Sequence, residues 1–453
     1  MAESTNTIQK EIQDREAKEK RELRRKRRRR NQILAILTLL LFVCLIVAII
    51  GTGVWYIMHR GAGKTAGGGA ATTEETTIDN LFESEDEIVK PEETNTEPAL
   101  TPEQQLDAIL DEAFISQMPL EDKVAGLFIV TPESITGVNK AVKAGDGTKD
   151  ALNKYAVGGI VYASQNMQDA AQFTEMVSNT TLYSRYALFT CVAEEGGSST
   201  SLEKAGLADK TDSEQAMGTG ADAAKAYEAS GKIADSMLTY GLNLNFAPVA
   251  DLATVQDSYL KDASYGSDAA LAASLVTSAV QGMQEKGISS CLKYFPGAAD
   301  MKEDPAKGMA TSERTAEQLA AEEFTVFKAG IDAGADMVMV GHVAVPALTD
   351  DNTPCSLSSA VITDKLRNEL GFNGVIITDA MNKGAITEYY EADEAAILAL
   401  KAGCDMILCP DDFEKAYNGV LEAVQNGTIS EERINDSLRR IYRIKYAGMM
   451  PEA

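Results

Sequence analysis

The chain has 453 residues, of which 45% are hydrophobic and 24% are charged, so it can form a large core and is not disordered throughout. Its formal net charge is -26, but the charge is uneven: the first 60 residues carry 13 basic and 6 acidic side chains, which leaves 29 basic and 62 acidic side chains for the remainder. An acidic surface repels phosphate groups, which argues against nucleic acid as a partner.

Residues 33–58 form a long apolar run without charge, sufficient as a helix to cross a bilayer. The run is too long for a signal peptide, and Trp55 and Tyr56 near its end suit a membrane interface. A basic run at 24–30 precedes it, and the positive-inside rule then places the N-terminus in the cytoplasm. The alternative, a nucleic-acid-binding tail, is disfavoured by this juxtamembrane position, which suits anionic lipid. We expect a single-pass protein of the cell membrane whose folded part is extracytoplasmic.

Four regions follow from this pattern: a basic cytoplasmic tail at 1–31, a transmembrane helix at 32–58, a disordered linker at 59–102 and a folded domain at 103–450. The linker is rich in Gly, Ala, Thr and Glu and has too little apolar surface to fold. Because the chain has only two histidines, His59 and His342, the six cysteines predict neither a zinc site nor a disulfide framework but small core residues. We expect no metal and no cofactor.

Eight short apolar runs, separated by amphipathic, helix-like segments, recur in the folded domain. They lie at 126–130, 159–162, 188–192, 244–248, 290–294, 337–341, 375–378 and 406–409. Continuous apolar runs are typical of parallel strands covered on both faces, and eight of them predict a closed (β/α)8 barrel of the TIM type. A doubly wound open sheet is the alternative. No phosphate-binding glycine motif follows the first run, so a nucleotide site has little support.

Working residues of such barrels follow the C-terminal ends of the strands, where eight loops meet at one mouth. The polar residues at these positions are Glu194, Glu195, Asp251, Lys293, Tyr294, Asp300, Glu303, Asp304, His342 and Asp379. A carboxylate in such a ring can act as nucleophile or base on a sugar. The alternative for any one carboxylate is a helix cap or an ion pair, and His342 can instead orient a neighbour by hydrogen bonding.

The order and spacing of several motifs resemble the family-3 glycoside hydrolases, specifically the single-barrel β-N-acetylhexosaminidases. The segments that carry the resemblance lie at 119–124, 127–130, 157–160, 245–251, 293–297, 342–346, 371–379 and 402–406. The resemblance implies a (β/α)8 barrel and a retaining mechanism with Asp379 as the catalytic nucleophile. It also implies that Lys293 binds the substrate. The other candidate substrate-binding residues at the mouth are Glu195, Asp251, His342 and Tyr294, of which Tyr294 stands where the family has a histidine.

The chain departs from this family where the resemblance places the general acid/base. The family's D-S-H triplet reads Asp304-Pro305-Ala306, so the aspartate is retained and the histidine is lost. Arginines are also missing from the segments at 193–198 and 263–266, which weakens the expected sugar contacts. Glu303 or Asp304, or Glu195 from the third loop, can replace the histidine if burial or a neighbouring carboxylate raises its pKa.

Two functions remain open. The first is a membrane-anchored glycosidase that acts on amino-sugar glycans such as those of a cell wall. The second is a catalytically silent barrel that binds a glycan or a protein at the cell surface, because a fold alone does not fix function. A barrel mouth filled by its own side chains, or an Asp379 carboxylate bound in an internal ion pair, would remove the case for glycan chemistry and leave only the second function.

Overall fold

The computed structural model describes residues 102–197, 200–298 and 300–447. Eight parallel strands close into a barrel in chain order, and β1 pairs with β8 to complete it. The strands are β1 (Phe128–Val130), β2 (Gly159–Val161), β3 (Phe189–Val192), β4 (Leu244–Asn245), β5 (Ser289–Phe295), β6 (Met337–Val340), β7 (Val375–Ala380) and β8 (Met406–Leu408). Each overlaps one of the eight predicted runs. The predicted TIM-type barrel is confirmed, and the open-sheet alternative is wrong.

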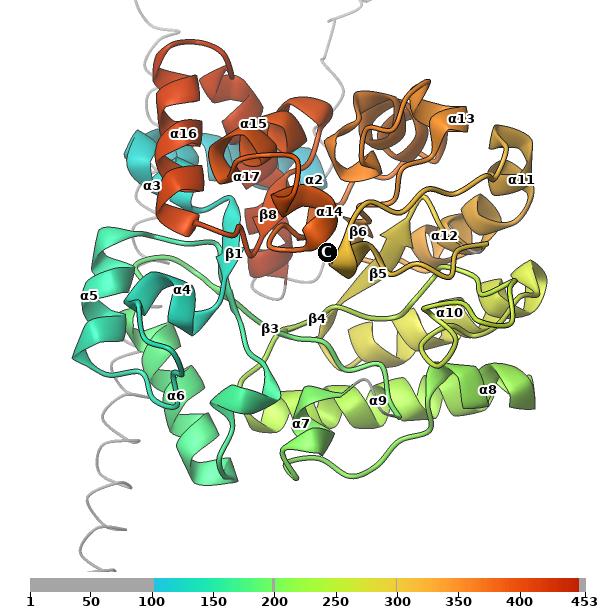
Figure 1. Cartoon of the computed structure of the whole chain (residues 1–453). Coiled ribbons are helices and arrows are strands. Elements are labelled where there is room, and N and C mark those ends of the chain that lie inside the picture. The colour runs from blue at the N-terminus through green and yellow to red at the C-terminus, as the bar shows by residue number, and fades with distance from the viewer. Residues whose placement is uncertain (1–101, 198–199, 299, 448–453) are drawn as a thin grey trace, which may run out of the picture. The chain divides into compact units, whose positions relative to one another are not determined.

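Helices surround the strands (Figure 1). The first half of the chain contributes α2 (Pro102–Ala113), η1 (Ile115–Gln117), α3 (Leu120–Ala125), α4 (Pro132–Thr136), α5 (Asp146–Lys154), η2 (Ser164–Asn166), α6 (Ala170–Tyr183), α7 (Ser201–Lys204), α8 (Glu214–Gly220) and α9 (Ala223–Thr239). The second half contributes α10 (Ala269–Gln284), η3 (Pro305–Lys307), α11 (Ala316–Ala321), α12 (Glu323–Asp332), α13 (Pro346–Thr349), η4 (Cys355–Leu357), η5 (Ala360–Glu369), α14 (Gly384–Thr387), α15 (Ala392–Ala402), α16 (Phe413–Gln425) and α17 (Glu431–Tyr446).

Helix α10 illustrates how the sequence produces this layer. Its N-cap residue Asp268 accepts a hydrogen bond from the backbone N–H of Leu271 at 2.9 Å, which satisfies one of the free donors of the first turn. Leu275, Val276 and Met283 are buried at helical spacing, and α10 packs between α9 and α12. The strands beneath are buried along their whole length in β1, β3, β6 and β8, as parallel strands covered by helices require.

The turn after β5 sends the chain across the barrel mouth and depends on a glycine. Gly297 has φ +108°, and a Cβ atom there would lie 2.5 Å from Cγ of Glu323. A side chain at 297 is therefore excluded both by the backbone conformation and by the helix α12 behind it. This turn fixes where the loop that carries Asp304 begins.

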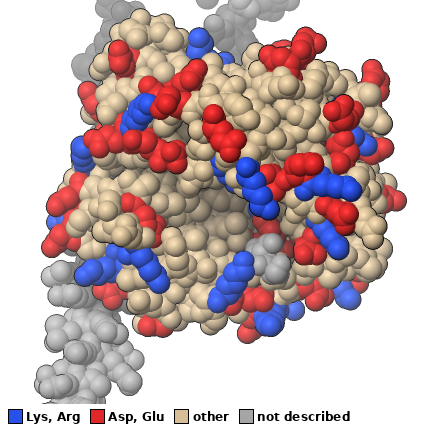
Figure 2. Space-filling view, viewed as in Figure 1, with Lys and Arg blue, Asp and Glu red and all other residues tan. Residues whose placement is uncertain are grey.

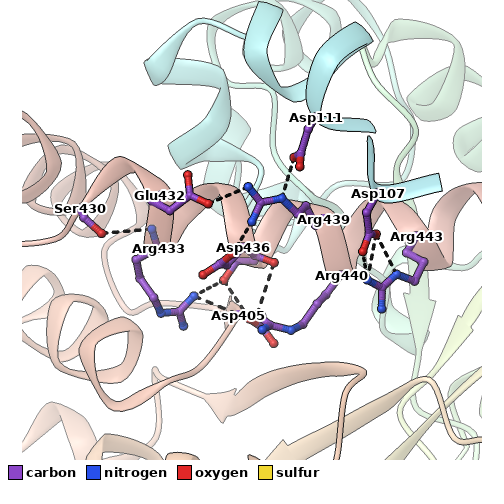
Figure 3. Close-up of polar contacts among 11 residues, drawn as sticks. Asp107, Asp111, Asp405, Ser430, Glu432, Arg433, Asp436, Arg439, Arg440 and Arg443 are labelled. Carbon is purple, nitrogen blue, oxygen red and sulfur yellow. Dashed lines mark hydrogen bonds and ion pairs between the residues drawn. The ribbon is translucent and has the colours of Figure 1, made fainter. Parts of the chain in front are cut away.

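The last helix, α17, ties the first described helix to the barrel (Figure 3). Arg443 and Arg439 of α17 reach Asp107 and Asp111 of α2, each with a shortest contact of 2.6 Å. Below α17, the fully buried Asp405 accepts hydrogen bonds from Arg440 at 3.0 Å. Arg367 and the N–H of Ile376 reach its other oxygen at 2.7 and 2.9 Å. The aspartate of the segment at 402–406 therefore joins α17 to β7.

The expected basic tail and transmembrane helix, and nearly all of the expected linker, lie outside the described residues and stay predictions. Within the described ranges, no helix has both the length and the apolar character needed to span a bilayer. Cys191, Cys291, Cys355, Cys404 and Cys409 are buried and form no disulfides, which agrees with their expected place in the core.

Candidate active site

A cavity of about 420 Å³ opens at the C-terminal ends of the strands. Figure 2 shows the hollow near the centre of this face of the molecule. Its lining residues come from the ends of β5 and β7 and from the loops after β3 to β7. They are Ala193, Glu195, Thr200, Ser201, Lys204, Tyr259, Leu260, Ala263, Tyr294, Ala298, Asp304, Pro305, Ala306, Gly341, His342, Val343, Asp379 and Lys383. The cavity therefore stands where barrel enzymes place their chemistry.

Asp379, the expected nucleophile, lies near the end of β7 and is 6% exposed. Its Oδ1 accepts the backbone N–H of Ala380 at 2.7 Å, and its Oδ2 accepts from Nζ of Lys383 at 2.6 Å. Burial raises the pKa of Asp379, but the charge and hydrogen bond of Lys383 and the N–H of Ala380 help to hold it below its usual value. The side chain is therefore a carboxylate at neutral pH, held in an internal ion pair.

Lys383 was not among the residues expected from the sequence. It lies four residues after Asp379, at the start of the short helix α14, and its side chain is 26% exposed. Burial lowers the pKa of Lys383, but the charge of Asp379 raises it by more. The net pKa lies above its usual value, so Lys383 stays an ammonium. No sequence signal points to this pair, because a four-residue spacing brings side chains together on a helix, whereas Asp379 lies in β7 and Lys383 precedes α14.

The predicted substrate-binding residues Lys293 and Glu195 form a second ion pair, and their side chains are only 3% and 9% exposed. Burial lowers the pKa of Lys293, but the charge of Glu195 raises it above its usual value. Glu195 lines the cavity, whereas Lys293 lies behind the lining, 5.4 Å from the ring centre of Tyr294. The two charges of the pair cancel, so it brings no net charge to the cavity. The ring of Tyr294 lies over the ammonium of Lys293.

His342 also lines the cavity, but both of its ring nitrogens are engaged. Nδ1 lies 2.7 Å from Oγ of Ser356, and Nε2 lies 3.0 Å from the carbonyl oxygen of Ala380. A carbonyl only accepts, so Nε2 carries the proton and donates it, and Nδ1 accepts from the serine. Burial lowers the pKa of His342, which keeps the ring neutral. His342 therefore orients the backbone next to Asp379.

Asp251, another expected substrate-binding residue, is not part of the cavity lining. Its two carboxylate oxygens accept the backbone N–H of Ala298 at 2.9 and 3.0 Å, and the side chain is buried. Burial raises the pKa of Asp251 well above its usual value. The residue holds the start of the β5 loop in place. Glu194 has a similar role in the β3 loop, where it accepts the N–H groups of Ser201 and Leu202 at 2.6 and 2.7 Å.

The two loop carboxyls expected to replace the missing histidine differ in position. Asp304 lines the cavity, and its Oδ1 accepts the N–H of Ala306 at 2.9 Å to cap η3. Glu303 is exposed and does not line the cavity. The loop packs closely against α14, since a Cβ atom on Gly384 would lie 2.8 Å from the backbone nitrogen of Gly308. The segment that carries the family's histidine therefore lies beside Lys383.

The described residues contain no group of three or more His, Cys, Asp or Glu side chains arranged to hold a metal ion. The cavity instead offers the ionised carboxylate of Asp379 and two tyrosine side chains. Its lining also holds two further acidic residues, Glu195 and Asp304, and two lysines, Lys204 and Lys383. A parallel barrel with a carboxylate at the end of β7 has the arrangement of barrel enzymes whose catalytic residues follow the strand ends, a class that includes carboxylate glycoside hydrolases.

The family model of the glycosyl hydrolase family 3 N-terminal domain matches residues 119–444. The chain therefore belongs to glycosyl hydrolase family 3. A β-hexosaminidase of Stenotrophomonas maltophilia (strain R551-3) is 30% identical over 284 residues, which are 60% of this chain and 82% of that protein.

Solved structures with a similar fold also include enzymes that act on N-acetylhexosamines. A family 3 β-N-acetylglucosaminidase from Paenibacillus sp. str. FPU-7 is 32% identical with a TM-score of 0.69, covering 74% of this chain and 64% of that chain. A β-N-acetylhexosaminidase from Beutenbergia cavernae DSM 12333 is 25% identical with a TM-score of 0.65, covering 73% of this chain and 99% of that chain. The chain is thus a family 3 member of the β-hexosaminidase type.

Proposed function

We propose that this protein is a membrane-anchored, extracytoplasmic glycoside hydrolase that cleaves β-N-acetylhexosaminides with retention of configuration. The observation that carries the proposal is the Asp379 carboxylate, which is buried yet ionised at the wall of the cavity. An ionised oxygen is required for attack on an anomeric carbon. The names of the similar Stenotrophomonas and Paenibacillus proteins favour an amino-sugar substrate, such as a cell-wall glycan.

The cavity suits a small sugar. Its volume of about 420 Å³ falls within the range of about 300–1,000 Å³ that is typical of small-molecule sites. Tyr259 and Tyr294 line it, and an aromatic side chain offers both an apolar face and a hydroxyl group to a sugar ring. In the proposed reaction Asp379 attacks the anomeric carbon to form a glycosyl ester, and water later releases the sugar.

A second candidate is a barrel that binds a glycan or a protein without cleaving it. Two observations favour it: both Glu195 and Asp379 are held in ion pairs, and Ala306 lines the cavity where the family has its histidine. Asp304 is the only one of the two expected loop carboxyls at the cavity, and it caps η3. This candidate requires binding at the same cavity with no turnover.

The anchor rests on the sequence alone. The uncharged run at 33–58 and the basic run at 24–30 support a single span with a cytoplasmic N-terminus, and the basic run suits anionic lipid. Protease added to intact cells should then remove the barrel from the cell surface. Full protection of the barrel from that protease would contradict this orientation.

The two candidates differ in turnover. The full-length chain in detergent should hydrolyse an aryl N-acetyl-β-D-glucosaminide, and Asp379→Asn should abolish this activity because an amide is a poor nucleophile. Asp332→Asn is the matched control, since Asp332 forms an exposed ion pair with Lys328 four residues away on α12. Binding of N-acetylglucosamine oligomers without hydrolysis, unchanged in Asp379→Asn, would support the second candidate instead.

A further inference from the structure

The cavity has an apolar wall, which the loops after β4 and β5 build together. Its members have hydrocarbon side chains, apart from one phenol, and are Tyr259, Leu260, Ala263, Pro305 and Ala306. The two loops lie side by side, since Lys302 and Asp257 form an ion pair between them at 3.8 Å. The charged residues Glu195 and Asp379 line the cavity from the β3 loop and from β7. The cavity therefore presents two chemically different sides to a substrate.

Two alanines of this wall stand at positions where the chain departs from the family pattern. Ala306 replaces the histidine of the D-S-H triplet, and Ala263 replaces an arginine in the segment at 263–266. Each change exchanges a basic, hydrogen-bonding side chain for a methyl group. A sugar hydroxyl group placed against the wall would lose water without gaining a partner, whereas an apolar group is favoured there.

The exposure of the lining residues indicates where the two parts of a substrate lie. Asp379, Glu195 and His342 are 6%, 8% and 0% exposed and form the inner end of the cavity. Ala306 is exposed and Ala263 is half-buried, so the wall reaches the opening. The sugar whose anomeric carbon is attacked has to reach Asp379 at the inner end. The leaving group, on the other side of the scissile bond, then lies toward the opening and against the wall.

We propose that the leaving group of the substrate is a phenol with an apolar substituent, and not a second sugar. The proposal rests on the proposed hydrolase function and narrows it, because the sugar stays an N-acetylhexosamine and the leaving group is now assigned. Two independent features support it. The wall offers apolar surface to an aromatic ring, and Ala306 has no proton to give to the leaving oxygen. A phenolate is a far more stable anion than an alkoxide, so its departure depends least on a proton donor.

The proposed reaction balances without a proton donor at the leaving oxygen. The Asp379 carboxylate forms a bond to the anomeric carbon, and the bond from this carbon to the phenolic oxygen breaks with its electron pair staying on the oxygen. The products are a neutral glycosyl ester and a phenolate, so the negative charge moves from Asp379 to the leaving group. Water then hydrolyses the ester to the sugar and the carboxylate, and the proton released in this step neutralises the phenolate.

The first test uses substrates that differ in apolar area but not in leaving-group acidity. The full-length chain in detergent is assayed with the 4-methyl-, 4-ethyl- and 4-propylphenyl N-acetyl-β-D-glucosaminides, whose phenols are nearly equal acids. Each added methylene group should raise kcat/KM by about 2- to 4-fold, as burial of a methylene group predicts. The 4-(hydroxymethyl)phenyl glycoside has the size of the 4-ethylphenyl glycoside but a polar end, so it should have the lower kcat/KM of the two.

Two variants place a polar group in the wall, one from each loop. Ala263→Asn and Ala306→Asn should each remove most of the gain along the alkyl series, because an alkyl group that covers the amide strips it of water. Ala320→Asn is the matched control, since Ala320 is an exposed alanine of α11 and does not line the cavity. It should keep the wild-type dependence on alkyl length.

The second test addresses the phenolic character of the leaving group. Asp304 and Lys204 also line the cavity, and either of them, acting as an acid, would assist alkoxide and phenolate departure alike. The cyclohexyl glycoside has an apolar ring of similar size but needs a proton to leave. It should have a kcat/KM more than about 10⁴-fold below that of the phenyl glycoside, since a general acid contributes up to about that factor.

Three results would overturn the assignment of the leaving group while the hydrolase function stands. They are a flat or falling kcat/KM along the alkyl series in the wild type, an alkyl series unchanged in both asparagine variants of the wall, and cleavage of the cyclohexyl glycoside or of N,N′-diacetylchitobiose about as fast as the phenyl glycoside. A wild type that cleaves none of these glycosides would reject the hydrolase function, and the assignment of the leaving group with it.

Discussion

Nε2 of His342 donates a hydrogen bond to the carbonyl oxygen of Ala380 at 3.0 Å, directly after the Asp379 carboxylate. The histidine that the sequence places at the mouth therefore supports the end of β7. Its other nitrogen accepts from Ser356 at 2.7 Å, so the ring joins the β6 and β7 loops. Burial lowers the pKa of His342, which favours the neutral imidazole in this arrangement.

The first prediction concerns His342 and pH. Because burial holds the pKa of His342 below its usual value of 6.5, the unfolded chain binds a proton that the folded chain resists. This contribution to the free energy of unfolding is fully present above pH 6.5 and decreases as the pH falls toward the folded-state pKa. Urea unfolding of the wild type and His342→Gln between pH 5 and 8 measures it. An unchanged pH dependence in the variant would contradict it.

The second prediction concerns the buried pair of Lys293 and Glu195. Glu195→Gln leaves the ammonium of Lys293 buried without its partner, and breaking such a pair typically lowers the free energy of unfolding by about 3–5 kcal/mol. The double variant Glu195→Gln with Lys293→Met removes both charges and should recover most of this loss. Urea unfolding of the two variants tests it. A double variant less stable than Glu195→Gln alone would be evidence against this account.

Much of the fold could be predicted from the sequence, because parallel strands covered on both faces need continuous apolar runs. The observed ends of two strands differ from the predicted ends. Residues 244–248 were expected as one strand, but β4 ends at Asn245, shortly before Pro248, which has no N–H to donate to a neighbouring strand. Strand β7 instead continues two residues past its predicted end, to Ala380. Asp379 therefore lies within the strand and not in the loop after it.

The site was predictable only in part. The position of Asp379, Glu195, Tyr294, Asp304 and His342 at the cavity follows from the strand ends, since every barrel loop leads to the same mouth. The contacts of each side chain depend on loop packing, which no periodicity reveals. Asp251 therefore holds the N–H of Ala298 behind the lining, and Lys293 is paired with Glu195.

The third prediction compares two aspartates near α17 (Figure 3). Asp405 is fully buried and accepts from Arg367 and Arg440, whereas Asp436 pairs with Arg439 and its side chain is 43% exposed. Asp405→Asn should lower the free energy of unfolding by about 3–5 kcal/mol, because partly buried arginines lose the counter-charge of a fully buried carboxylate. Asp436→Asn should cost at most about 1 kcal/mol, as exposed pairs do. Equal losses of free energy of unfolding in the two variants would contradict the prediction that the buried aspartate contributes more than the exposed one.

The last prediction concerns the ionisation of Asp379. Lys383 holds the pKa of Asp379 below its usual value of 3.8 against the opposing effect of burial. In Lys383→Met the burial effect remains and the cation is gone, so that the pKa of Asp379 should rise above 3.8. The acid limb of kcat/KM for an aryl N-acetyl-β-D-glucosaminide should therefore shift to higher pH in this variant. Lys383→Arg keeps a positive charge at the same place and should leave the limb close to that of the wild type. A limb that stays in place in Lys383→Met would mean that Asp379 is not the group that titrates.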